Sequence, residues 1–388
     1  MPVLAGTSGL GTLGIVRVAV VSESFLPAVN GVTNSVLRVL EHFQRNGHEA
    51  VVIAPGRGRG ECHAGAAVVR VRSVPLPRYR SFRLGLPSPR IEATLRAFAP
   101  DVVHVASPFM LGAHGAAAAC RLGVPVVAVY QTDVASFLSS YRLGVAAPLA
   151  WRWLARVHGW AALTLAPSRA AMEDLRRHGI GPLALWPRGV DGERFHPRER
   201  DPALRRALAP GGEVLVGYVG RLAHEKQVGL LAALAGLPGC RLVVVGDGPR
   251  RRRLEAALPW ARFLGLRTGR ELASVFASLD VFVHTGAGET FCQAAQEALA
   301  SGVPVVAPAA GGLLDLVRHG ENGLLWPAGD AAALRAAVAA LVADPATRRA
   351  YGQAARRTVA GRTWAAMGKR LLGHYAAALD ARPLREVA

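Results

Sequence analysis

The sequence predicts an α/β protein built from two doubly wound domains that face a central cleft. Its 388 residues exceed what one ordinary hydrophobic core accommodates. Short runs of β-branched residues alternate with helical patterns rich in Ala, Leu and Arg, which is typical of βαβ units on parallel sheets. Residues 186–212 are rich in Pro, Gly and charge and separate two series of these units. We therefore expect two domains joined by a hinge in this segment.

The apolar runs predict the strands of each domain. Strands are expected at residues 17–21, 50–53, 68–71, 102–105, 124–129 and 163–166, and then at 214–219, 241–245, 261–264, 281–284 and 303–307. Residues 364–379 predict a closing helix. We expect domains over residues 1–195 and 196–363, and a final segment, 364–388, whose helix crosses back to the first domain.

The composition is that of a well-buried globular protein, with 51% apolar and 19% charged residues. The net charge of +19 indicates an anionic partner. Almost all basic residues are arginine, however, and the high Ala, Gly and Arg content is also typical of a GC-rich genome. Charge alone therefore leaves nucleic acid, an acidic membrane and a phosphorylated substrate open.

The sequence favours a cytoplasmic protein. Its four cysteines lie far apart, without a C-x-x-C pair, and are expected to be reduced. No apolar run reaches the roughly 18 residues that span a bilayer. The first residues lack the basic start of a signal peptide. We expect a protein that at most touches the inner face of a membrane as a peripheral partner.

Residues 70–90 alternate arginines with apolar side chains and prolines. The arginines are Arg70, Arg72, Arg78, Arg80, Arg83 and Arg90. This pattern suits the boundary of an anionic bilayer, and a long solvated loop explains it almost as well. Binding of nucleic acid is disfavoured, because no motif for it accompanies the charge.

Glu289 and Glu297 are the most informative residues, because their spacing decides between two chemistries. Glycoside hydrolases place two carboxylates roughly 5 to 9.5 Å apart. Eight helical positions at about 1.5 Å each would separate these backbones by about 12 Å, which suits two distant hydroxyl groups of one long ligand. Thr290 and Gln293 form a T-x-x-Q pattern typical of a capping box. The N–H groups near Phe291 would then face an anion at a helix N-terminus.

Glycine-bearing turns follow several strands of the second series. The first contains Gly220 and Arg221, with Lys226 five positions further on, a small cationic clamp suited to a diphosphate. Gly246 and Gly248 form a second turn, and residues 311–313 start another. Because the carboxyl ends of parallel strands share one edge, we expect the three turns to converge there.

Other glycines and several absent motifs bear on function. A G-x-G-x-x-G run begins at Gly9 but precedes the first strand, so a nicotinamide dehydrogenase is disfavoured. After that strand, Gly31 would let a phosphate or sugar approach the backbone closely. The sequence has no D-x-D, H-E-x-x-H, P-loop or G-x-S-x-G motif. We therefore expect no metal and no cofactor.

Together these residues resemble the retaining glycosyltransferases of family 4, which have the GT-B fold with two Rossmann-like domains. The resemblance extends from Arg17 onward and includes the E-x7-E pair, residues 219–222 with Lys226, the turn at 246–249, the hinge at 188–191 and residues 301–306. Residues 24–27, 29–32 and 130–133 are similar to GDP-mannose-dependent α-mannosyltransferases acting on glycolipids. This implies an N-terminal domain that binds the acceptor and a C-terminal domain that binds the nucleotide sugar.

The resemblance implies a role for each matching residue. Arg221 and Lys226 would neutralise the donor diphosphate, Glu297 would hold the ribose hydroxyls and Glu289 those of the sugar. The remaining donor contacts would come from Gly31, Gly220, Gly246, Gly248, Phe263, Leu264, Phe291 and Cys292. Many relatives carry a histidine where this chain has Gln131, so we expect Gln131 to bond the sugar and Asp133 to orient or deprotonate the acceptor hydroxyl.

We predict a metal-independent enzyme that transfers a hexose, most simply mannose from GDP-mannose, to a glycolipid or glycan hydroxyl by front-side attack. Arg221 and Lys226 would stabilise charge on the leaving diphosphate. Two alternatives stay open from the sequence. One is the same fold with a UDP-sugar donor, and the other is a non-catalytic basic protein that binds membranes or nucleic acid.

Overall fold

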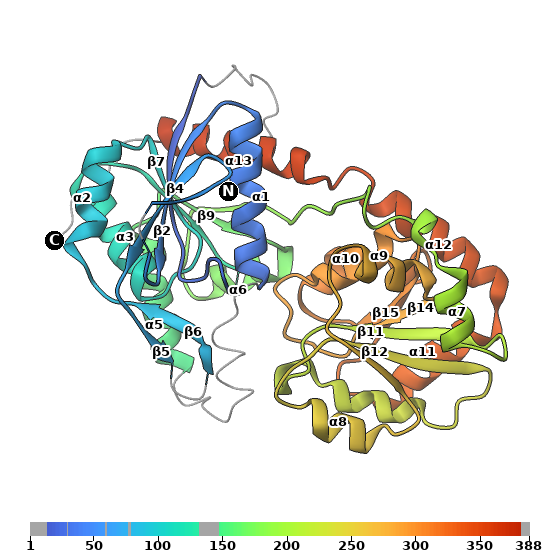
Figure 1. Ribbon diagram of the computed structural model, residues 1–388. Helices are drawn as coiled ribbons and strands as arrows, with labels where there is room; N and C mark the ends of the chain where they lie inside the picture. The colour runs from blue at the N-terminus through green and yellow to red at the C-terminus, as the bar shows by residue number, and fades with distance from the viewer. Residues whose placement is uncertain (1–13, 29, 59, 77–78, 132–146, 382–388) are drawn as a thin grey trace.

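The computed structural model describes residues 14–28, 30–58, 60–76, 79–131 and 147–381. It confirms the α/β prediction, with two parallel sheets and helices on both faces (Figure 1). None of the helices in this part of the chain combines the length and apolar character that crossing a bilayer requires.

The N-terminal sheet has the strand order β10-β9-β8-β7-β1-β2-β4-β3 and is parallel except for β3, which pairs antiparallel with β4. Its strands are β1 (Arg17–Val21), β2 (Glu49–Pro55), β3 (Glu61–His63), β4 (Ala66–Val71), β7 (Val102–Val105), β8 (Val126–Val129), β9 (Leu163–Ala166) and β10 (Leu183–Leu185). Its helices are α1 (Gly31–Arg45), α2 (Pro89–Phe98), α3 (Met110–Arg121), α5 (Ala147–Gly159) and α6 (Arg169–Arg177).

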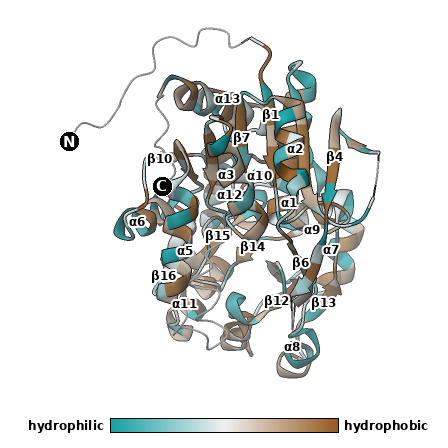
Figure 2. Ribbon diagram, turned by 90° about the vertical axis from the view of Figure 1, so that its left-hand side faces the viewer, coloured by the Kyte–Doolittle hydropathy of each residue, from teal (hydrophilic) through white to brown (hydrophobic). Residues whose placement is uncertain are grey.

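The strands of this sheet are buried on both faces, as expected for a parallel sheet between helices. Val18 and Val20 pack with Phe43 of α1, whereas Ala19 and Val21 pack with Leu111 of α3. Figure 2 shows hydrophobic residues along β1, β4 and β7, and hydrophilic residues on outer helices such as α6. Successive side chains of β1 therefore pack against opposite helical layers, which holds the strand between them.

The C-terminal sheet is parallel, with the order β13-β12-β11-β14-β15-β16. Its strands are β11 (Val214–Val219), β12 (Cys240–Val245), β13 (Arg262–Gly265), β14 (Val281–Val283), β15 (Val305–Pro308) and β16 (Gly323–Trp326). Its helices are α7 (Pro202–Leu208), α8 (Arg251–Ala257), α9 (Gly269–Ser278), α10 (Gln293–Ala300), α11 (Ala331–Ala343) and α12 (Pro345–Val359), with short 3₁₀ turns η2 (Pro197–Glu199), η3 (His224–Lys226), η4 (Val228–Leu234) and η5 (Gly311–Asp315).

The last helix, α13 (Trp364–Asp380), runs from the C-terminal domain back along the N-terminal domain and lies beside α1 (Figure 1). Leu371 and Tyr375 belong to the core of the first sheet. The buried Tyr375 hydroxyl lies 2.7 Å from His104 Nδ1, and Trp186 Nε1 donates to the carbonyl of Met367 at 2.9 Å. These contacts anchor α13 in the N-terminal domain.

The arginine-rich segment is not a simple loop. It forms an antiparallel hairpin of β5 (Ser73–Leu76) and β6 (Tyr79–Gly85) and continues into α2. The alternation of arginine and apolar residues has the two-residue period of a strand, and the prolines obscured it. Arg78 lies outside the described residues.

Candidate functional site

The site lies at the carboxyl edge of the C-terminal sheet, where the loop after β14 carries Glu289. The expected capping box is wrong, because α10 begins only at Gln293 and its N-cap, Cys292, makes no side-chain capping bond. Thr290 Oγ1 instead donates to the carbonyl of Gln131 at 3.1 Å, and Gln293 Nε2 donates to the carbonyl of Gly189 at 3.1 Å. Both side chains therefore link the two domains. Glu289 itself lies in the loop, so the helical estimate of its separation from Glu297 does not hold.

Two cationic side chains contact one oxygen of Glu289. Lys226 Nζ lies 2.5 Å and His284 Nε2 lies 2.9 Å from Glu289 Oε1. Burial alone would raise the pKa of Glu289, but the Lys226 ammonium and His284 lower it to about 2. Burial alone would likewise lower the pKa of Lys226, and Glu289 raises it. The carboxylate is therefore ionised and fixed in place at neutral pH.

His284 was not predicted from the sequence as a site residue. It follows β14 directly and is 2% exposed, with its ring stacked near those of Tyr218 and Phe282. Burial alone would lower the pKa of His284, but Cys292 and Glu289 raise it to about 9. A lone histidine after a buried strand usually belongs to a core, so no sequence signal distinguished it.

His284, Glu289 and Cys292 are also of the types that bind zinc, and each offers a ligand atom within 4.8 Å of the others. Lys226 already contacts the same carboxylate, and its positive charge would repel a metal ion. We therefore interpret this cluster as a carboxylate held between two cations rather than as a metal centre.

The expected convergence of glycine turns is confirmed. A Cβ on Gly246 would come within 1.9 Å of the carbonyl oxygen of Gly220, and one on Gly248 within 2.5 Å of that of Leu222. A Cβ on Gly311 would come within 2.5 Å of the carbonyl oxygen of Glu289. Each glycine has a positive φ that also disfavours a side chain. The first two turns pack backbone against backbone, and the third packs against the loop that carries Glu289 at the same edge of the sheet.

The other predicted donor-binding residues lie around these turns. Arg221 follows β11 and forms an ion pair with Glu225. Phe263 and Leu264 belong to β13, and Phe291 is buried just before α10. Arg221 and Phe291 follow the neighbouring strands β11 and β14, whereas β13 lies beyond β12 at the edge of the sheet.

Glu297 lies on α10 and is half-buried. Burial raises its pKa to about 8, although Arg194 favours the ionised form. The two glutamates of the pair therefore differ in charge at neutral pH. Glu289 is a carboxylate between two cations, whereas Glu297 is largely protonated.

The N-terminal side of the site is formed by the start of α1 and the end of β8. Asn30 caps α1, and its Oδ1 accepts hydrogen bonds from Val32 and Thr33 N–H at 3.0 Å each. Gln131 Nε2 donates to the carbonyl of Ala106 at 3.1 Å. The amide of Gln131 is thus engaged within the protein. Asp133 lies outside the described residues.

Arg188 joins these elements and was named from the sequence only as part of the hinge. Its Nη1 donates to the carbonyl of Gly31 at 2.5 Å, and its Nη2 donates to Gln131 Oε1 at 2.7 Å. The carbonyl of Arg188 accepts from Gln296 Nε2 of α10 at 3.0 Å. One hinge residue therefore contacts α1, the end of β8 and the C-terminal domain.

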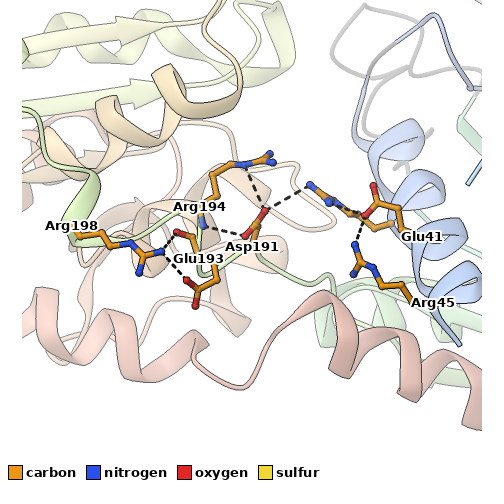
Figure 3. A network of polar contacts seen from close by, with 7 residues as sticks. Glu41, Arg45, Asp191, Glu193, Arg194 and Arg198 are labelled. Atoms are coloured by element: carbon orange, nitrogen blue, oxygen red, sulfur yellow. Dashed lines mark hydrogen bonds and ion pairs between the residues drawn. The ribbon is translucent and has the colours of Figure 1, made fainter.

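A charged network connects α1 of the N-terminal domain to the hinge (Figure 3). Asp191 lies 3.9 Å from Arg38 and 3.6 Å from Arg194, while Arg38 also pairs with Glu41 at 2.9 Å. A cavity of about 430 Å³ adjoins Arg38, Glu41, Asp191 and the start of α13. The network ties the orientation of α1 to the hinge.

A second cavity, of about 590 Å³, lies in the N-terminal domain beside the β5–β6 hairpin. Its arginines are Arg57, Arg70, Arg72, Arg83 and Arg90. Arg70 is buried and paired with Glu61 at 2.5 Å. We call this set the arginine cavity.

Comparison with known proteins places both halves of the chain in glycosyltransferase families. The profile of Glycosyltransferase Family 4 matches residues 29–194, and that of Glycosyl transferases group 1 matches residues 200–358. A GDP-mannose-dependent alpha-mannosyltransferase of Mycolicibacterium smegmatis is 53% identical and covers 95% of this chain and 99% of its own. The protein of the same name from Corynebacterium glutamicum is 48% identical, covering 93% and 88%.

Solved structures agree with this fold. Sucrose-phosphate synthase from Thermosynechococcus elongatus superposes with a TM-score of 0.79 at 23% identity, over 95% of this chain and 100% of that one. HepE from Anabaena, in complex with UDP, gives a TM-score of 0.74 at 18% identity, over 93% and 100%. The fold is therefore GT-B, with two Rossmann-like domains. The chain belongs to glycosyltransferase family 4 and is a glycosyltransferase.

Proposed function

We propose that this enzyme transfers mannose from GDP-mannose to a hydroxyl of a glycolipid or glycan, retains the anomeric configuration and needs no metal. The donor assignment rests on similarity over nearly the whole chain, with about half of the residues identical, to enzymes named GDP-mannose-dependent alpha-mannosyltransferases. The ionised Glu289 between Lys226 and His284 supports it, since a fixed carboxylate suits sugar hydroxyls.

The cations of the site would stabilise the leaving group. As the bond between the sugar C1 and the β-phosphate oxygen breaks, negative charge develops on the diphosphate. Lys226 and Arg221 follow β11 and would offset this charge, while Glu297 would accept hydrogen bonds from the ribose. Because both cations are held by carboxylates before substrate binds, little reorganisation is required.

The acceptor would attack from the face that the diphosphate leaves. The acceptor oxygen forms a bond to C1, the bond from C1 to the phosphate oxygen breaks, and the acceptor proton passes to the leaving phosphate. Glu289 is a weak nucleophile because two cations hold its pKa near 2. This argues against a covalent sugar–enzyme intermediate at Glu289.

The arginine cavity suggests how the enzyme would meet a lipid acceptor. Val74 of β5, next to the lining residue Ser73, is 44% exposed, and Leu86, which lines the cavity just after β6, is 36% exposed. Arginines beside exposed apolar side chains suit the boundary of an anionic bilayer. We therefore place a peripheral membrane contact at the hairpin.

Vesicle flotation tests the membrane contact. Replacing Arg57, Arg72 and Arg90 with Gln should reduce flotation with anionic vesicles, with little change on zwitterionic ones. Replacing Arg252, Arg253 and Arg349, which are exposed in the C-terminal domain, removes the same charge elsewhere and should have little effect. Equal losses in the two triple variants would assign the binding to net charge alone.

Thermal stabilisation by nucleotides tests the donor. A ligand that binds only the native state raises the melting temperature, so GDP and GDP-mannose should stabilise the protein more than UDP, ADP or their sugars. A UDP-selective shift would keep the reaction class and overturn mannose. No shift with any nucleotide would contradict a nucleotide-sugar enzyme.

A further inference from the structure

In the described part of the chain, Arg188 is a buried cation whose side-chain hydrogen-bond partners are all neutral. Its guanidinium donates to a carbonyl oxygen of Gly31 and to the amide oxygen of Gln131, and it is 9% exposed. Within the described ranges it forms no ion pair with a carboxylate. A buried charge without a counterion is costly, so its retention needs an explanation.

The charge on Arg188 persists at neutral pH. Burial lowers its pKa to about 10, and the nearby Glu289 opposes that shift. Arg188 is close enough to Glu289 for the two charges to interact, so Arg188 and the Lys226–Glu289 pair lie in the same region. Arg188 approaches this region from the hinge, whereas Lys226 comes from the C-terminal sheet.

The charges of this region do not balance. Arg188, Lys226 and His284 are cationic at neutral pH, Glu289 is the carboxylate that Lys226 and His284 contact, and Glu297 is largely protonated. Positive charge therefore exceeds negative charge among these side chains, and Arg221 is already paired with Glu225. The diphosphate of a nucleotide sugar carries two negative charges and would neutralise this excess.

We propose that Arg188 binds the donor diphosphate as a third cation, from the N-terminal side of the cleft. Arginine suits this role, because its planar fork has five N–H donors and two of them are used here on neutral oxygens. The same bonds to Gly31 and Gln131 fix the guanidinium before the donor arrives. The inference rests on the proposed nucleotide-sugar function and adds a residue to it.

Calorimetry with GDP and GMP separates a diphosphate contact from a general effect on the fold. The Kd for GDP should rise about ten- to a hundredfold in Arg188→Gln, which is the usual effect of losing a hydrogen bond to a charged group. The Kd for GMP should change far less, because GMP lacks the β-phosphate. The measured quantity is therefore the Kd for GMP divided by the Kd for GDP, and this ratio should fall in Arg188→Gln.

Two further variants make the test decisive. Arg188→Lys keeps the charge but loses the fork, so its ratio should lie between wild type and Arg188→Gln. If the glutamine variant does not fold, a reduced ratio in the lysine variant supports the inference and a wild-type ratio overturns it. Arg335→Gln is the matched control, since Arg335 also bonds two carbonyls, those of Ala233 and Ala235, but on α11.

The outcomes distinguish this inference from the proposed function. If wild-type protein binds neither GDP nor UDP, the nucleotide-sugar function itself is wrong. If UDP binds instead of GDP, the same ratio is measured with UDP and UMP. If wild type binds the diphosphate and Arg188→Gln shows an unchanged ratio, or loses both nucleotides equally, Arg188 has a structural role only.

Discussion

Lys226 Nζ lies 2.5 Å from Glu289 Oε1, and these residues come from loops that follow two adjacent strands, β11 and β14. The pair links the residue expected to neutralise the diphosphate to the residue expected to hold the sugar. His284 Nε2 lies 2.9 Å from the same oxygen. Both cations therefore act on one oxygen of the residue expected to hold the sugar.

The first prediction concerns this pair. Lys226→Ala removes a cation from the leaving-group side and should lower kcat about 100- to 1000-fold, the usual effect of losing one preorganised electrostatic contact. Glu289→Gln should lower kcat similarly while removing the buried charge. Initial rates and melting curves would be measured together. Near-normal rates in both variants would contradict the assigned roles.

The second prediction concerns Gly311, which supports the Glu289 backbone. Gly311→Ala and Gly329→Ala both place a side chain at positive φ, which costs about 1 kcal/mol each. Only the Gly311 substitution collides with the Glu289 carbonyl, because nothing lies within 4 Å of a Cβ on Gly329. We expect Gly311→Ala to lose about 100-fold in activity and Gly329→Ala to stay active. Equal activities would show that Glu289 does not depend on this turn.

The third prediction is a pH dependence from Glu297. Its pKa rises from 4.5 to about 8 on folding, so the native state favours the protonated acid. Its contribution to stability is therefore present below pH 4.5 and is lost as pH rises to about 8. Glu297→Gln does not titrate, and its melting temperature relative to wild type should increase over that interval. A constant difference between the two proteins would refute the raised pKa.

The fourth prediction concerns His284, whose folded pKa of about 9 exceeds the ordinary value of 6.5. A raised histidine pKa stabilises the fold fully below pH 6.5, and this contribution is lost as pH rises through about 9. The stability advantage of wild type over His284→Gln should shrink across that range. Chemical denaturation at several pH values measures it, and an advantage that grows with pH would reverse the assignment.

Most of the fold was predictable, because its signals are local. The buried β-branched runs predicted strands such as β1, β7 and β11, and the glycine turns after them had to converge because parallel strands share one carboxyl edge. The β5–β6 hairpin was missed because proline disfavours strands.

The parts of the site that depend on contacts between distant segments were not predictable. Thr290 and Gln293 fit a local capping rule, but each bonds a backbone carbonyl of the other domain or the hinge instead. His284 and Arg188 look ordinary in sequence, and their importance follows only from the approach of Glu289, Gly31 and Gln131 in three dimensions.

The most direct test of the central claim is transfer of labelled mannose from GDP-mannose into a lipid extract, followed by analysis of the new glycosidic bond. Wild-type protein should form an α-mannoside from GDP-mannose without added metal, and Glu289→Gln should form almost none. A β-linked product, or transfer from a UDP-sugar but not from GDP-mannose, would contradict the account.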